Sequence, residues 1–174
     1  MTTRTPSISY ETEKQALLRS LSSARHAVLR EAREVRLARQ STVFLGTWSA
    51  RHLVAHLIGW DHTNAQAAAQ ILRHRVPSFF RHHDHDWVTY NAALVRRHNR
   101  GAYRNLLASA TNSSDRLLAF LQQIPASKFF QDSGLRSRGW KVTIARLLAA
   151  EANDERTHAS QLKRFRTTTA MHPR

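Results

Sequence analysis

The chain has 174 residues, 41% of them hydrophobic, which fits one domain with one core and excludes an intrinsically disordered chain. It has no cysteine, which excludes disulfides, thiolate nucleophiles and cysteine-ligated zinc sites. Lys and Arg number 27 against 12 acidic residues, a formal net charge of +15, but the arginines are spread over every predicted helix, as on a solvated surface.

The composition also favours long helices over short elements. Only 5 Gly and 4 Pro occur, so turns are few. No run of about 18 apolar residues is present, so we expect no membrane-spanning helix and no membrane partner. The first residues lack the apolar stretch of a signal peptide, and a cytoplasmic location is therefore expected.

The first half of the chain shows two amphipathic helical patterns. The spacing of apolar residues predicts a helix over about 11–39 and, after a loop over 40–48, a second helix capped by Ser49 and ending before Pro77. A histidine, His56, interrupts the apolar stripe of this second helix. A loop rich in imidazole follows at 79–86, where metal binding is expected to be weak and adventitious, or where the loop serves as a lid.

The second half continues the helical pattern. It predicts a short helix over about 87–99, a long helix over about 103–123, a loop over 125–139 and a last helix over about 142–165, with a frayed end after it. No segment shows the alternation of a strand. Together these patterns predict an all-α four-helix bundle with an extra short helix between the second and third long helices.

Three polar residues share the apolar face of the last helix. Glu151, Asp154 and His158 are spaced three and four apart, so they project together. Because buried polar groups need partners, we predict that His56, Asp154 and His158 bind a divalent metal ion, with open positions for catalysis. The alternative is a buried polar network without metal. The proximity of His56 to the last helix is an assumption about packing.

Other side chains near this face have two interpretations each. Glu151 is predicted to pair with an arginine of the first or third helix, or else to accept a hydrogen bond from a metal ligand or act as a general base on metal-bound water. Glu155 is expected to face solvent or an arginine. The four tryptophans could line a pocket, but core packing is the commoner role of aromatic residues in bundles and is the one expected here. These residues are Trp48, Trp60, Trp87 and Trp140.

Four segments carry a resemblance to a known family: the string Trp48-Ser-Ala-Arg-His-Leu-Val-Ala-His-Leu-Ile-Gly-Trp60, and residues 87–91, 139–146 and 154–161. Together they resemble the DinB-like superfamily of four-helix bundles, and within it the ClbS/DfsB-type branch. The resemblance covers residues 12–165 and implies a single domain over 1–174. Similar proteins often hold a divalent metal with three histidines. Here Asp154 stands where a histidine is usual, beside His56 and His158, so the resemblance implies Zn, Ni, Fe or Mn on a harder donor set, or a site that has lost its metal.

The resemblance leaves three functions open. The first is a divalent-metal-dependent hydrolase or thiol transferase that acts on a small reactive molecule. The second is a metal-free small-molecule-binding or protection protein of the ClbS/DfsB type. The third is a basic protein that associates with nucleic acid without sequence specificity. Whether the protein is an enzyme stays open, and a homodimer formed through a helix face is expected.

Overall fold

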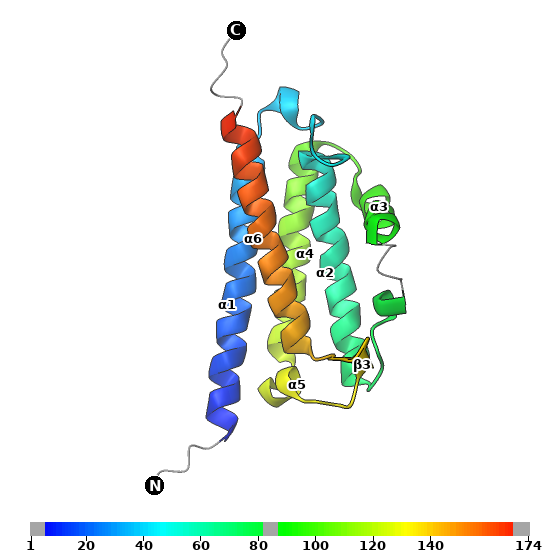
Figure 1. Cartoon of the computed structure of the whole chain (residues 1–174). Helices are drawn as coiled ribbons and strands as arrows, with labels where there is room; N and C mark the ends of the chain where they lie inside the picture. The colour runs from blue at the N-terminus through cyan, green and yellow to red at the C-terminus, as the bar shows by residue number, and fades with distance from the viewer. Residues whose placement is uncertain (1–5, 82–86, 169–174) are drawn as a thin grey trace.

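The computed structural model describes residues 6–81 and 87–168, and its frame is a bundle of four long helices (Figure 1). These are α1 (Pro6–Arg33), α2 (Ala50–Leu72), α4 (Tyr103–Gln123) and α6 (Ile144–Thr168). Helix α1 packs along α6 and α2 packs along α4. Within each pair the helices run in the same direction, and the two pairs run in opposite directions (Figure 1). The predicted all-α four-helix bundle is confirmed.

Two groups of buried apolar residues fill the bundle. One contains Val28, Leu53 and Leu57, and the other contains Leu121 and Leu148, all fully buried or nearly so. Each buried leucine stabilises the fold by about 1.5–3 kcal/mol relative to an exposed one. The helical periodicity of the sequence therefore identifies the face that each helix gives to the core.

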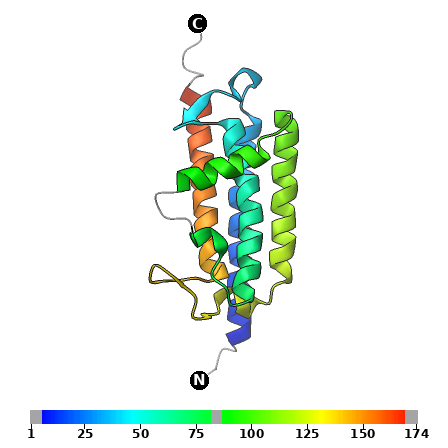
Figure 2. The ribbon, with the colours of Figure 1, turned by 90° about the vertical axis from the view of Figure 1, so that its right-hand side faces the viewer.

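The predicted extra helix is α3 (Trp87–His98), which lies across the outside of α2 (Figure 2). The two helices approach closely at Gly59, where an added Cβ would lie 2.7 Å from the Cβ of Leu94. Glycine is required here because any larger residue would push α3 away. This contact holds α3 above the part of α2 that carries His56.

The ends of two helices differ from the prediction. Helix α1 ends at Arg33 rather than near residue 39, because Arg36 adopts an extended backbone with φ −54° and ψ 145°. Only the 3₁₀ turn η1 (Leu37–Arg39) follows it. Helix α6 begins at Ile144, where the Thr143 hydroxyl accepts a hydrogen bond from the Arg146 N–H at 3.2 Å, and it continues three residues beyond Phe165.

The structure adds two short hairpins for which the sequence showed no strand pattern. Strands β1 (Val43–Leu45) and β2 (Trp48–Ser49) form one antiparallel hairpin, and β3 (Arg136–Ser137) and β4 (Trp140–Lys141) form another. Strands of two or three residues are too short to display an alternating pattern, so periodicity does not reveal them. The predicted loops also contain η2 (Ser78–Arg81) and the short helix α5 (Ala126–Phe130).

Some expectations fall on residues that the structure does not describe. The histidine-rich segment His82–Asp86 and the end of the chain after Thr168 lie outside the described residues. Among the residues that are described, no helix combines the length and apolar character needed to cross a membrane.

Candidate functional site

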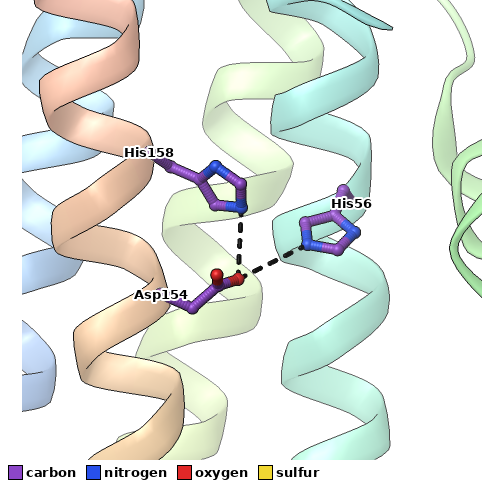
Figure 3. Close-up of side chains that lie close together, drawn as sticks. All are labelled: His56, Asp154 and His158. Carbon is purple, nitrogen blue, oxygen red and sulfur yellow. Dashed lines mark ion pairs between the residues drawn. The ribbon is translucent and has the colours of Figure 1, made fainter. Parts of the chain in front are cut away.

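The side chains of His56, Asp154 and His158 meet between α2 and α6 (Figure 3). Asp154 Oδ2 lies 3.2 Å from His158 Nε2 and 3.9 Å from His56 Nε2. One donor atom from each residue lies within 4.8 Å of the other two. The helices bring together the three residues that the sequence analysis selected, which was the assumption about packing on which the site depended.

His158 is held by polar atoms on both sides of its ring. Gln161 Oε1 lies 2.8 Å from Nδ1, and Asp154 lies beyond Nε2. When Nδ1 donates its proton to Gln161, the close approach of the lone pair on Nε2 to a carboxylate requires a positive charge, supplied either by a proton on Nε2 or by a cation. Burial opposes protonation, but the hydrogen bond and charge of Asp154 raise the pKa of His158 above its ordinary value.

His56 has a different environment. Its ring is buried against Trp48, with ring centroids 4.6 Å apart, and its Nδ1 has no hydrogen-bond partner among the described residues. Burial lowers the pKa of His56, and Asp154 offsets this only in part. His56 is therefore the neutral imidazole of the pair, which is the form that binds metals.

Asp154 is the exposed member of the centre. Its side chain is 56% exposed, whereas both histidines are buried. Contacts with the imidazoles of His158 and then His56 hold the pKa of Asp154 well below its usual range, so it stays a carboxylate. The centre thus has one anionic oxygen and two imidazole nitrogens, open to solvent on the Asp154 side.

A cavity of about 530 Å³ opens beside this centre. Its wall is mostly aromatic and apolar, and includes Trp48, Trp60, Phe79, Phe80 and Trp87. The Trp60 indole N–H donates to Asn91 Oδ1 at 3.1 Å, which fixes the ring against α3. Core packing was the favoured role for these tryptophans, but three of them line the cavity. Trp140 does not line it and is 68% exposed.

Glu151 lies one turn before Asp154 and also lines the cavity. Burial, and then the charge of Glu155, raises the pKa of Glu151 to about 8. Its carboxyl group is therefore mostly protonated at neutral pH. The predicted pairing with an arginine is absent, because no ion pair joins Glu151 to an arginine among residues 6–81 and 87–168.

A buried ionic cluster lies behind the centre. Arg25 donates two hydrogen bonds to Asp61, at 2.7 and 2.8 Å, and also binds Glu155 through Nε at 3.0 Å. Ser113 donates to Asp61 as well, so the cluster joins α1, α2, α4 and α6. Of the two environments predicted for Glu155, the arginine is the one observed, and the residue is fully buried.

The sequence analysis missed the other three members of this cluster, which are Arg25, Asp61 and Ser113. It assigned Arg25 to the solvated surface, whereas the side chain is 4% exposed. Its position, four residues after Leu21 and three before Val28 on the apolar stripe, was the available signal. The analysis also missed Asn64, which lines the cavity and whose Nδ2 has no hydrogen-bond partner among the described residues.

No family model matches the sequence, and a search of curated proteins finds no match. Solved structures that resemble the bundle include the following two. One is the colibactin self-resistance protein ClbS in complex with double-stranded DNA, with 16% identity and a TM-score of 0.73 over 88% of this chain and 95% of that one. The other is an uncharacterised protein from Escherichia coli UTI89, with 13% identity and a TM-score of 0.73 over 92% and 96%. The chain therefore has a ClbS-like fold.

Proposed function

We propose that this chain is a small-molecule-binding protection protein of the ClbS type, within the DinB-like superfamily. The observation that carries the proposal is the cavity of about 530 Å³, which is lined both by the aromatic wall and by the His56–Asp154–His158 centre. Its size suits a small organic molecule, and its few polar groups converge on one point. Similarity to a self-resistance protein supports this reading.

The test blocks the cavity and leaves the core intact. Ala150 lines the cavity and is exposed, whereas its neighbour Ala149 is exposed and outside the cavity. We expect Ala150→Trp to abolish binding of the apolar probe anilinonaphthalene sulfonate, measured by energy transfer from tryptophan, and Ala149→Trp to leave it unchanged. Equal binding by wild type and both variants would remove the cavity as the ligand site.

A second candidate is a divalent-metal-dependent hydrolase or thiol transferase. The residues fit such an ion: two imidazole Nε2 atoms and one carboxylate oxygen face one another, and Gln161 fixes His158 in the orientation of a ligand. Zn, Ni, Fe and Mn all accept this donor set. Such an ion supplies an activated water or thiol.

In this candidate, the chain's own residues would handle protons around the reacting molecule. Glu151, protonated at neutral pH, would donate a proton there rather than act as the general base that the sequence suggested. A nearby cation would lower its pKa and restore a base role. The aromatic wall would hold the substrate and exclude water from the Glu151 side.

Metal analysis tests this candidate. We expect about one equivalent of zinc or nickel to raise the melting temperature of the wild type, and His158→Ala or Asp154→Ala to remove the effect. A variant with His82, His83 and His85 changed to Ala is the matched control, because adventitious binding in that segment would be lost there instead. Metal content that is unchanged in His158→Ala would exclude the centre.

A third candidate is association with duplex nucleic acid. The net charge of +15 favours contact with phosphates, and ClbS was solved in complex with double-stranded DNA. Such binding would be independent of sequence and would weaken steeply as salt rises. A labelled duplex titrated at low and at physiological salt tests this, and affinity independent of salt would contradict the electrostatic origin.

A further inference from the structure

The β3–β4 hairpin holds an aromatic and two basic side chains in a fixed arrangement just before α6. Arg136 pairs with Lys141 and Ser137 with Trp140, and the turn between them has φ values of +51° at Arg138 and +80° at Gly139. Two positive φ values are typical of the tight hairpin turn whose twist matches that of its strands. The backbone of this hairpin is therefore held by its pairing and by the turn, which sets the face from which each side chain projects.

Trp140 is the hairpin residue with the most unusual exposure to solvent for its type. It is 68% exposed, although tryptophan is one of the most strongly buried residue types on average. It lies outside the cavity, and the Arg146 guanidinium lies over its ring, 5.5 Å from the centroid. An ordered, exposed tryptophan next to cations is typical of a binding surface.

Basic side chains lie on both faces of the hairpin, because Arg146 lies over the Trp140 ring while the cross-strand pair Arg136 and Lys141 projects from the other face. Arg136, Lys141 and Arg146 are exposed, and one acidic residue, Asp132, binds Arg136 at 2.7 Å and Lys141 at 3.1 Å. Three cations against one carboxylate leave a positive surface, and Asp132 fixes the direction of two of the cations. Arg75 and Arg81 lie across a groove that Ser137 also lines, which extends the positive charge onto the neighbouring loop.

We propose that the hairpin surface, defined as Arg136, Trp140, Lys141 and Arg146, docks on the phosphodiester backbone of a nucleic-acid duplex. The inference rests on the proposed association with nucleic acid and names its site. The three cations contact phosphates, and the indole packs against the sugars at the groove edge. Because Lys141 and Arg146 also line the cavity, docking places the cavity mouth beside the duplex.

A second group of arginines provides the matched control. Arg96, Arg97 and Arg100 are exposed at the end of α3 and the loop after it. They carry the same charge as the three hairpin cations, but they do not line the cavity that the hairpin shares. If net charge alone attracts the duplex, both groups must contribute equally.

The experiment compares two triple variants by fluorescence anisotropy of a short labelled DNA duplex. Arg136→Gln/Lys141→Gln/Arg146→Gln is expected to weaken binding at least about tenfold, and to reduce the slope of log affinity against log salt by about 2 to 3. Arg96→Gln/Arg97→Gln/Arg100→Gln is expected to change affinity less than about threefold. Circular dichroism and melting temperature confirm that both variants fold.

Single changes provide an independent readout. Trp140→Ala is expected to weaken binding several-fold with an unchanged salt slope, because it removes contact area but no charge, and Trp140→Phe to restore part of the loss. Asp132→Asn is expected to strengthen binding, because it releases Arg136 and Lys141 from their carboxylate partner.

The outcomes separate the two proposals. Equal losses in both triple variants would retain association with nucleic acid and overturn the hairpin surface as its site. No binding by the wild type at low salt would overturn both. Binding to anionic phosphatidylglycerol vesicles as tight as to the duplex, and equally lost in the hairpin variant, would overturn the assignment of the partner as nucleic acid.

Discussion

At the scale of single residues, side chains of the same chemical type in and beside the centre have opposite protonation states. Two carboxyl groups one helical turn apart differ in charge: Asp154 is exposed, paired with histidines and ionised, whereas Glu151 is buried and has its pKa raised to about 8. The two histidines differ in the same way, because Asp154 stabilises the protonated form of His158 while burial favours neutral His56. Such separation of pKa values allows one site to hold an acid and a base together.

The protonation of Glu151 gives a test at this scale. Because its pKa is raised from 4.5 to about 8, the folded state binds more protons than the unfolded state between these values. The contribution of Glu151 to the free energy of unfolding is fully present below pH 4.5. It is lost as the pH rises from 4.5 to about 8, by up to about 1.4 kcal/mol per pH unit. We expect Glu151→Gln to lack this loss, so the variant should be the more stable protein at pH 8 in urea unfolding.

The control for this measurement is Glu34→Gln, which changes an exposed carboxyl group. It should show the pH dependence of the wild type. If Glu151→Gln and the wild type lose stability in parallel between pH 5 and pH 8, the buried carboxyl is not the group that titrates.

At the scale of elements, the site depends on where α3 lies. Helix α3 supplies Trp87 and Asn91 to the cavity wall, and it is held to α2 by the close contact at Gly59. The helices α2 and α6 supply the three residues of the centre. The position of this short helix therefore decides whether Trp87 and Asn91 complete the cavity wall.

Gly59→Ala tests this contact. Alanine gains about 1 kcal/mol of helix propensity over glycine, but its Cβ would lie 2.7 Å from the Leu94 Cβ, and overpacking of this kind costs about 1–3 kcal/mol. Because a Cβ atom cannot rotate away, we expect the clash to dominate. The variant should melt at a lower temperature and bind the apolar probe more weakly. An unchanged melting temperature with unchanged probe affinity would show that α3 adjusts freely.

At the scale of the whole molecule, the Arg25 cluster ties the helix pairs together. Arg25 comes from α1 and binds Asp61 of α2 and Glu155 of α6, and Ser113 of α4 completes the contacts. Glu155 directly follows Asp154 in α6, so the cluster also fixes the rotation of the helix that carries the centre. Buried ion pairs add little net stability, but they favour one packing arrangement over others; we take that to be the role of this cluster.

Arg25→Met should therefore cost about 3–5 kcal/mol, because it leaves two buried carboxylates without a partner. The triple variant Arg25→Met/Asp61→Leu/Glu155→Leu should recover most of this stability, since no unpaired charge remains. Chemical unfolding measures both, and Arg116→Met on the exposed face of α4 is the control. A loss below about 1 kcal/mol in Arg25→Met would show that water reaches the cluster.

The expected homodimer also belongs to this scale and stays a prediction. Size-exclusion chromatography at micromolar concentration should give about twice the mass of the 19.9 kDa chain. Elution of the 19.9 kDa species alone would reject it.

The sequence by itself determined the helices, their apolar faces and the three polar residues of the centre, because helical periodicity is local and places residues three and four apart on one face. It could not determine which helices pair, and so the meeting of His56 with Asp154 became known only from the packing of α2 against α6. The burial of Arg25, the cavity wall from η2 and α3, and the hairpin that exposes Trp140 are likewise tertiary. Each depends on contacts between residues distant in the chain, for which a single sequence carries no periodic signal.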